Sequence, residues 1–360
     1  MSKEIAKSVV RECMNIRGDD VVWIGTWQHM VDLASLISIE CNKIGAKSIM
    51  TLETDPACYS FMLDTPIALL KKPNPTILKL CDESTVNIFI VGPANPLRMP
   101  EISAERWAAK SEGEKYFIDR MAENKKRTVY ISLGLVTPQR AETYGFNYEA
   151  WKENVTAATA VNYKLLREFG TKVKSILSNA RKVHVTGKNV DLTLDLGNRR
   201  RNLSDGVIDE KDMKIGTYEE YLPAGNVLIA PIETSAEGYV EFDLPVYQVS
   251  KVIEGLKWTF KSGKVVDYDA KKNIEAIKEW WKQAKGDKDR IGAIYFGINP
   301  IGKLGYLDDC SVRGAVSISI GDNRNYGGQN DSDYIFEGTL SKATVELDGK
   351  LFIKEGKYVF

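Results

Sequence analysis

The chain has 360 residues, of which 43% are hydrophobic, so it is long enough to form two domains with sizeable cores. Its 49 Lys and Arg residues are balanced by 49 Asp and Glu residues. This balance provides no overall field to attract nucleic acid or an anionic membrane, and we expect neither as a partner.

The sequence shows no sign of export or membrane insertion. No apolar run approaches the roughly 20 residues that a membrane-spanning helix needs. The first residues, MSKEIAKSVVREC, are charged and lack the apolar core of a signal peptide. The five cysteines are dispersed without CxxC spacing, which favours reduced thiols over disulfides or a cysteine-based zinc site. We therefore predict a cytoplasmic protein.

The first half of the chain alternates helical patterns with short apolar runs. Strands are predicted at 21–26, 47–53, 86–92 and 127–133, and helices at about 3–17, 29–45 and 102–123. This alternation predicts a largely parallel sheet with helices on its faces. No GxGxxG motif follows the first strand, so the sequence does not indicate a dinucleotide site.

The second half has a different pattern. One long amphipathic helix is predicted over about 148–178, and a further helix at about 270–285. The remaining segments alternate as strands, with hairpin signals at Ser262-Gly263, Asp348-Gly349 and Glu355-Gly356. We therefore predict an α/β N-terminal domain over residues 1–180 and a β-rich α+β C-terminal domain over residues 181–360.

The two histidines do not form a metal-ligand pattern. His29 follows the first predicted strand, at the end of a sheet where α/β proteins bind ligands, although a structural role at a helix start is favoured. His184 lies in the middle of a predicted strand and is expected to be structural. The two residues are far apart in sequence and lack spacing such as HxxxH.

Three further motifs allow chemistry, but a structural role is favoured for each. GINPIGKL (297–304) has phosphate-loop spacing, but a leucine replaces the magnesium-binding Ser or Thr. The run Arg199–Arg201 could bind an anion, although a solvated hairpin end is favoured. Cys310 follows Asp308 and Asp309, which should raise its pKa, and no histidine lies nearby in sequence. These two aspartates are expected to be solvated loop residues.

Two groups of carboxylates could offer oxygen ligands to magnesium or calcium. The groups comprise Glu233, Glu237, Glu241 and Asp243, and Asp331, Asp333 and Glu337. Most of them alternate with apolar residues, as in half-exposed strands, so a solvated role is favoured. An ion site drawn from Glu233, Glu237, Asp333 and Glu337 remains open.

Six segments point together to one protein family. They are TPQRAETYGFNYEAWKENV (137–155), NVDLTLDLGNRRRNLSDG (189–206), LPAGNVLIAPIETSAEGYVEFD (222–243), RIGAIYFGINP (290–300), GAVSISIG (314–321) and GGQNDSDYIFEG (327–338). In this order they resemble the thermophilic metalloaminopeptidases of the aminopeptidase T and aminopeptidase S type. The resemblance implies a homodimer with a cleft in the C-terminal half that holds two divalent metals, such as zinc or cobalt.

The resemblance also implies where the metal ligands should fall. The expected acid of the first metal segment falls at Asn226, the next glutamate at Ala293 and a histidine at Ser317. A His-x-Asp pair falls at Ile335 and Glu337, so only Glu337 keeps a metal-capable side chain. We therefore expect no metal cofactor, because complete ligand sets supply roughly 10–16 kcal/mol at structural zinc sites. The missing histidines also argue against a non-haem iron dioxygenase site.

The loop after Ser317 remains polar and rich in glycine. Arg324 could clamp a carboxylate or phosphate, and Tyr326 could stack on a ligand or donate a hydrogen bond, although an ordinary loop is equally favoured. The cleft candidates are Asn226, Glu233, Ala293, Ser317, Arg324, Tyr326 and Glu337.

The sequence thus predicts a family member that has lost its dinuclear metal site. It would use the remaining cleft to bind a small organic or peptide ligand, or for metal-independent chemistry. Two alternatives remain open. One is a divergent aminopeptidase with relocated metal ligands, and the other is a structural or assembly protein built from the family dimer as a homodimer or larger homo-oligomer.

Overall fold

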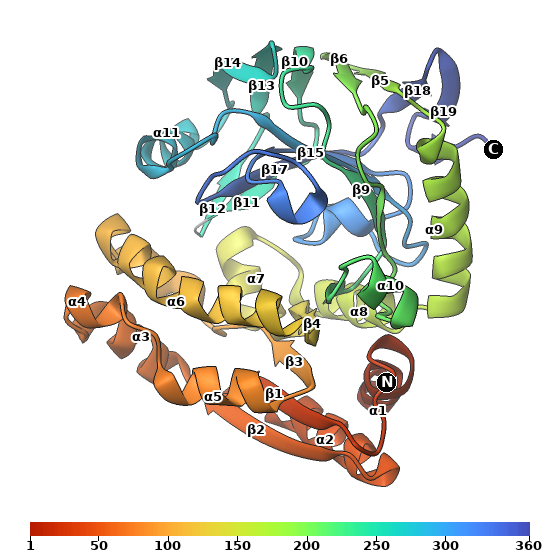
Figure 1. Ribbon diagram of the computed structural model, residues 1–360. Coiled ribbons are helices and arrows are strands. Elements are labelled where there is room, and N and C mark those ends of the chain that lie inside the picture. Colours follow the sequence, from red (N-terminus) through yellow and green to blue (C-terminus); the bar gives the residue numbers. More distant parts are fainter. Residues whose placement is uncertain (249) are drawn as a thin grey trace. The chain divides into compact units, whose positions relative to one another are not determined.

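The structure, a computed structural model, describes residues 1–248 and 250–360. The chain divides into two units (Figure 1). The first comprises residues 1–163 and 206–223, and the second comprises residues 164–205 and 224–360. The domain boundary predicted at residue 180 stays a prediction.

The first unit contains a five-stranded sheet in the order β2-β1-β3-β4-β8. All four pairings are parallel, which confirms the predicted sheet type. The strands are β1 (Val21–Trp27), β2 (Lys47–Glu53), β3 (Val86–Ile90), β4 (Arg127–Ile131) and β8 (Glu219–Leu222). β8 was not predicted, because it is only four residues long and its sequence, EEYL, is too short to show a clear strand pattern.

Helices cover this sheet, and several begin at side chains that cap them. They are α1 (Ser2–Ser8), α2 (Val31–Ile44), α3 (Asp55–Asp64), α4 (Ile67–Leu70), α5 (Pro75–Glu83), α6 (Ala104–Asn124), α7 (Pro138–Tyr144), α8 (Tyr148–Thr159) and α10 (Glu210–Lys214). Thr54, Asn74, Ser103, Thr137 and Asn147 each accept a backbone N–H at a helix start. Side chains of α5 and α6 pack around Trp23 on one face of the sheet.

The single helix predicted over 148–178 is wrong. α8 ends at Thr159, and α9 (Tyr163–Ser178) begins after a short break. The Tyr163 hydroxyl donates to the Thr159 carbonyl (2.5 Å), so a side chain satisfies a carbonyl at the end of α8. The apolar stripe continues through this break, which is why periodicity alone did not reveal it.

The second unit contains two larger antiparallel sheets. The eight-stranded sheet has the order β14-β13-β10-β6-β5-β18-β19-β20, and the five-stranded sheet has the order β17-β16-β15-β9-β7. The first consists of β5 (Lys182–Gly187), β6 (Val190–Asp195), β10 (Glu237–Glu241), β13 (Lys257–Lys261), β14 (Lys264–Asp269), β18 (Thr344–Leu347), β19 (Lys350–Lys354) and β20 (Lys357–Tyr358). The second consists of β7 (Asn202–Ser204), β9 (Asn226–Ile229), β15 (Ile291–Gly297), β16 (Val316–Gly321) and β17 (Ile335–Leu340). The unit also contains the pair β11 (Val246–Gln248) and β12 (Lys251–Ile253), with α9 and α11 (Ile274–Gln283).

The predicted hairpin turns are present in the eight-stranded sheet. The turns at Ser262-Gly263, Asp348-Gly349 and Glu355-Gly356 join β13 to β14, β18 to β19 and β19 to β20. Both residues of each pair have positive φ, between 45° and 79°, as two-residue hairpin loops require.

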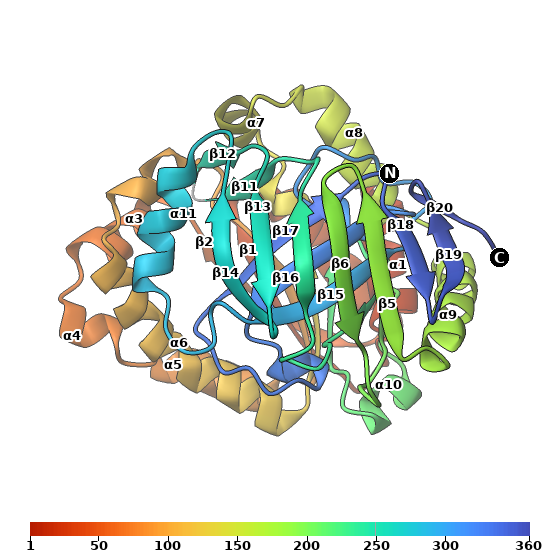
Figure 2. The same ribbon diagram turned by 90° about the horizontal axis from the view of Figure 1, so that it is seen from above.

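The two large sheets of the second unit lie face to face (Figure 2). Aromatic side chains pack between them. The ring of Trp258, on β13, lies 6.0 Å from the ring of Phe336, on β17. Phe242 lies edge-on to Trp258 at 4.9 Å. Gly338 leaves room for this ring, because a Cβ atom at residue 338 would lie 2.5 Å from Phe242. One face of the five-stranded sheet is therefore committed to the core.

A buried ion pair joins the N-terminal ends of strands in the first unit. Arg127 donates to the Asp20 carboxylate (2.6 Å), which also accepts from the Thr85 hydroxyl (2.6 Å) and the Arg17 backbone N–H (2.7 Å). Desolvation raises the pKa of Asp20, but these hydrogen bonds outweigh it and hold the pKa below its ordinary value.

We expect Arg127→Met to lower the free energy of unfolding by about 3 kcal/mol at pH 7, because the Asp20 carboxylate would lose its charged partner. The pKa of Asp20 is depressed, so its contribution is present above an ordinary carboxyl pKa of about 4 and is lost as the pH falls. The difference in unfolding free energy between wild type and Arg127→Met should therefore become smaller as the pH falls. Urea unfolding at several pH values measures both this difference and its pH dependence.

Arg120→Met is the matched control. Arg120 is about half exposed, and its ion pairs with Asp82 (3.5 Å) and Glu123 (4.0 Å) are long. The cost of this substitution should stay below about 1 kcal/mol. Equal costs for the two substitutions would contradict the role given to the Asp20 network.

Candidate functional site

The second face of the five-stranded sheet is polar. Strand register places Leu228, Tyr295, Ser317 and Thr339 in one row across four strands. A neighbouring row contains Ala293, Ser319 and Glu337. Side chains alternate along a strand, so these residues, together with Asn226 and Ile335, share the face opposite the aromatic core. The register thus brings onto one face the five positions at which the family resemblance implies metal ligands.

The serines and threonine of this face are buried and bonded to one another or to the backbone. Ser317 and Thr339 share a hydrogen bond of 2.7 Å between their hydroxyl oxygens. The Ser319 hydroxyl accepts the backbone N–H of Ala293 (3.0 Å) at an irregularity in the β15 pairing. These three hydroxyls therefore help to hold the sheet together.

Glu337 lies half-buried in this face. Desolvation raises its pKa to about 7, although hydrogen bonds with Ser317 and Cys310 lower it in part. Desolvation also raises the pKa of the Cys310 thiol, and the nearby carboxyls of Glu337, Asp308 and Asp309 raise it further. Cys310 is therefore held as a thiol and is unsuited to act as a nucleophile.

Asn226 contributes an acceptor without a donor. Its side-chain oxygen, Oδ1, is buried and has no hydrogen-bond partner among the described residues. A buried polar atom without a partner costs free energy, and such atoms in native proteins commonly face a water or a ligand. Asn226 is also the first of the five family ligand positions along the chain.

Tyr326 and Arg324 have different surroundings, although both lie in the short helical turn Arg324–Tyr326. Tyr326 packs against the cluster of Leu228, Ala293 and Tyr295, on the polar face. Arg324 is engaged by two carboxylates, those of Asp322 (2.6 Å) and Asp331 (2.9 Å). Tyr326 therefore lies against the polar face, whereas Arg324 is held by acids of its own loop.

The arginine run is not a solvated hairpin end, so that interpretation is wrong. Arg201 is buried and donates to the carbonyls of Leu177 (3.1 Å) and Ala180 (2.7 Å), at the end of α9. Arg199 pairs with the Glu233 carboxylate, and Arg200 donates to the Asn325 carbonyl (2.6 Å). The run thus fixes a helix end and the loop that carries Tyr326.

Glu233 is part of the same loop contact. The prediction that it is solvated is wrong. It is buried, and its carboxylate also accepts the backbone N–H of Gln329 (2.7 Å). Asp309 is likewise buried rather than solvated, and accepts the backbone N–H groups of Gly305 (2.8 Å) and Tyr306 (3.0 Å). Desolvation raises the pKa of Asp309 to about 7.

The other carboxylates proposed for a relocated ion site bond to separate parts of the backbone. Glu237 accepts the backbone N–H of Ser262 (2.6 Å), and Asp333 accepts that of Lys285 (2.8 Å). Among residues 1–248 and 250–360, no three His, Cys, Asp or Glu residues are grouped so that they could hold a metal ion.

The remaining sequence candidates have structural contacts. His29 shares a hydrogen bond with the Gly134 carbonyl (2.8 Å), and His184 one with Asp191 (2.8 Å). In the segment 297–304, the Asn299 side-chain oxygen accepts the backbone N–H groups of Ile301 (3.0 Å) and Gly302 (3.3 Å), as in an ordinary turn.

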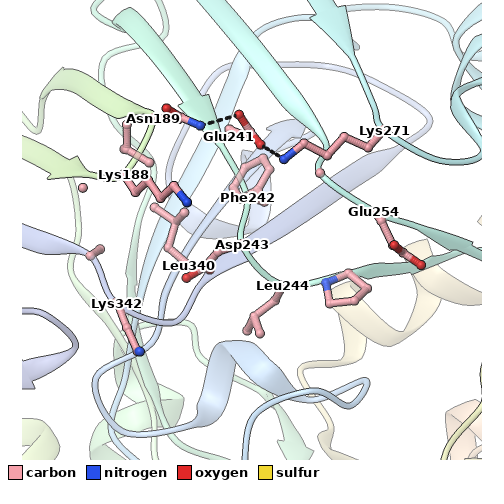
Figure 3. Close-up of a pocket in the computed structure, with 15 residues that line it drawn as sticks. Lys188, Asn189, Glu241, Phe242, Asp243, Leu244, Glu254, Lys271, Leu340 and Lys342 are labelled. Carbon is pink, nitrogen blue, oxygen red and sulfur yellow. Dashed lines mark hydrogen bonds and ion pairs between the residues drawn. The ribbon is translucent and has the colours of Figure 1, made fainter.

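A separate pocket of about 490 Å³ lies beside the β5–β6 turn, the end of β10 and the end of β17 (Figure 3). Lys188, Lys271 and Lys342 line it, together with Glu241, Asp243 and Glu254. In Figure 3, Asn189 and Lys271 both bond to Glu241. The three cations and three carboxylates balance, so the pocket indicates no charge class of ligand. Glu241 and Asp243 come from the first group of candidate oxygen ligands, but none of the seven cleft candidates lines the pocket.

The family follows from comparison with known proteins. Residues 2–294 match the family described as thermophilic metalloprotease (M29). The chain belongs to this family. The match confirms the resemblance inferred from the six segments, and it ends before β16 and β17, which carry Ser317, Ile335 and Glu337.

One curated protein with a similar sequence is aminopeptidase PepS of Streptococcus thermophilus. The two are 32% identical over 96 residues, which is 27% of this chain and 22% of PepS. The matched part thus spans only about a fifth of that relative.

Two solved structures share the fold. Wild-type AmpT from Thermus thermophilus superposes with a TM-score of 0.77 and 17% identity, covering 100% of this chain and 99% of that one. The 2,5-dihydroxypyridine dioxygenase of Pseudomonas putida KT2440 superposes with a TM-score of 0.65 and 13% identity, over 99% and 96%. The predicted combination of an α/β region and a β-rich region is confirmed by the first of these.

Sequence reasoning missed Tyr295, Ser319 and Thr339 as members of the polar face. The signal was present, because period-two alternation puts Tyr295 with Ala293, and Ser319 with Ser317. No similar signal marks the burial of Arg201 or Asp309, which depends on distant carbonyls and loop backbone.

We expect Glu337→Gln to stabilise the protein more at pH 8 than at pH 5. The folded pKa of about 7 lies above the ordinary carboxyl value, so the folded state binds the extra proton between these values and wild-type stability falls as the pH rises. The gain should differ by about 1–3 kcal/mol between the two pH values in urea unfolding. Glu355→Gln, at an exposed turn, is the control and should give no such difference.

We expect Arg199→Met to release the loop that carries Tyr326, because it removes the pair with Glu233 and the donor to the Gly327 carbonyl (2.7 Å). Amide hydrogen exchange over residues 324–330 should quicken by roughly ten-fold or more. Arg324→Met is the control, since Arg324 is itself about half exposed and pairs only with acids of its own loop, and its effect should stay within about three-fold. Equal effects would count against the arginine clamp.

Proposed function

We propose that this chain is an M29-family protein that works without the dinuclear metal centre of metalloaminopeptidases. It uses the polar face of the five-stranded sheet to bind a small organic or peptide ligand, or for metal-independent chemistry. Asn226, Ala293, Ser317, Tyr326 and Glu337 are the residues that we place in this site, and Glu233 supports it through the loop.

One observation carries the proposal. The strand register gathers all five family ligand positions on one face, yet four of them hold Asn, Ala, Ser and Ile. A neutral amide and a hydroxyl are weak metal ligands, and the hydroxyl of Ser317 is already bonded to Thr339. Glu337 alone cannot replace a ligand shell, so these residues do not fit a pair of divalent metals.

The chemistry of the face suits a neutral polar molecule. Asn226 offers a buried acceptor, and a carboxyl at Glu337 with a pKa near 7 can accept or donate a hydrogen bond at neutral pH. Tyr295 and Tyr326, with ring centroids 6.4 Å apart, offer aromatic surface beside them. A few polar groups on an otherwise apolar wall are typical of small-molecule sites.

The two alternatives receive less support. A divergent aminopeptidase with relocated ligands would need four carboxylates, those of Glu233, Glu237, Asp333 and Glu337, to converge. The first three instead accept backbone N–H groups from three separate segments. A purely structural role would not explain why the Oδ1 atom of Asn226 is buried without a hydrogen-bond donor among the described residues. We also propose, from the family resemblance, that the protein acts in the cytoplasm as a homodimer or larger homo-oligomer. No helix in the described chain is long and apolar enough to cross a membrane.

Elemental analysis of untagged protein, produced with and without added zinc and cobalt, tests the proposal. We expect much less than one metal ion per chain, and no hydrolysis of aminoacyl amides with either metal. Stoichiometric metal, together with activity that chelators abolish and metal restores, would establish the divergent aminopeptidase instead.

A reversed variant provides the matched control. Asn226→Glu, Ala293→Glu, Ser317→His, Ile335→His and Glu337→Asp, combined in one chain, restore the ligand types that the family implies. If the face retains the family geometry, this variant should bind roughly two metal ions per chain under the conditions that leave the wild type empty. Circular dichroism checks that it folds.

A further inference from the structure

The open edge of the parallel sheet is apolar. β2 is the terminal strand of that sheet, and among the described residues it pairs only with β1 (Figure 1). Ile49, Met50 and Leu52 expose 45%, 36% and 55% of their surface. Because residues 49 and 50 are consecutive, apolar side chains are exposed on both faces of the strand. Native edge strands usually carry a charge or a proline in such a position, and here the only charges stand at the two ends.

The backbone of β2 is directed for pairing on this edge. The backbone N–H of Lys47 donates to the Asp20 carbonyl (3.0 Å), so the odd-numbered residues of β2 bond towards β1. The N–H and C=O groups of Ser48, Met50 and Leu52 therefore point away from β1, to the open edge. These groups form a ready template for one more strand.

The sequence KSIMTLE complements itself in one antiparallel register. When Met50 of one copy lies opposite Met50 of another, Ser48 faces Leu52 and Ile49 faces Thr51. The same register places Lys47 opposite Glu53 twice, once at each end. Among the described residues, no ion pair is recorded for Lys47 or Glu53. Desolvation raises the pKa of Glu53, and the nearby Lys110 of α6 lowers it in part.

The register also satisfies the hydrogen-bond geometry. Met50 is one of the residues whose backbone groups point outward, so the two central residues can exchange both N–H···O bonds. The pairs of Lys47 with Glu53 then occupy non-hydrogen-bonded positions, where opposing side chains come closest. A strand shifted by one residue would lose both features.

We propose that two copies of this chain pair β2 to β2 in antiparallel orientation, centred on Met50, and so join their parallel sheets into one. The pairing covers Ile49, Met50 and Leu52 and closes the open edges of both copies. This inference deepens the self-association proposed above by naming its surface, and it does not depend on the ligand site.

A charge swap on the full-length protein tests the register. Lys47→Glu places like charges at both ends of the pairing, so the dimer dissociation constant, measured by sedimentation velocity, should rise by roughly ten- to a hundred-fold. The double variant Lys47→Glu with Glu53→Lys restores complementary pairs and should regain most of the affinity. Lys72→Glu, an exposed lysine after α4, makes the same charge change elsewhere and should leave the constant unchanged.

Disulfide trapping tests the centre of the pairing. A Met50→Cys variant places two cysteines opposite each other at about 5.5 Å between Cα atoms, within the range for a disulfide. Mild oxidation should convert most of it to a covalent dimer. Leu97→Cys, which is also exposed, and the wild type with its five native cysteines should remain uncrosslinked.

The outcomes separate the two proposals. A wild-type dimer that Lys47→Glu does not weaken and Met50→Cys does not crosslink would overturn the β2 pairing while leaving self-association in place. A wild type that is monomeric across the micromolar range would overturn both. Dimer loss in the single variant, recovery in the swap and crosslinking at residue 50 would together support the register.

Discussion

The packing of two sheets through Trp258 is the constraint on which the second unit depends. Trp258, Phe242 and Phe336 fill the space between the sheets, and Gly338 permits the close approach of the Phe242 ring. Strand side chains alternate, so committing one face of the five-stranded sheet to this core fixes what lies on the other. The polar face is therefore a consequence of the core, and its register cannot slip without turning apolar residues outward.

The same constraint separates family membership from family chemistry. The core and its register preserve the positions at which relatives are expected to hold metals, because those positions follow from strand pairing. The side chains at these positions are free to change, since they do not contribute to the packing between the sheets. A shared fold thus gives no assurance of a shared reaction. In this chain the hydroxyls of Ser317 and Thr339 bond to one another, whereas the buried amide oxygen of Asn226 has no partner among the described residues.

Features with local causes could be predicted from the sequence, whereas features with distant partners could not. Ser262-Gly263 and Asp348-Gly349 adopt positive φ because of their own residue types, so their turns were predictable. The parallel sheet likewise followed from the alternation of helical and apolar segments. The burial of Arg201 depends on carbonyls more than twenty residues away, and that of Glu233 on Arg199 and Gln329. The break after α8 was hidden because the apolar stripe runs through it.

The late position of β8 in the chain affects how the protein can be made and divided. The first four strands of the parallel sheet are complete by Ile131, but the strand that covers β4 is not synthesised until Leu222. During translation, the edge of β4 that pairs with β8 stays unpaired while about ninety further residues are synthesised. A fragment cut at any point before residue 219 keeps that edge exposed permanently. The amino-terminal region is therefore not a module that can be detached by a single cut.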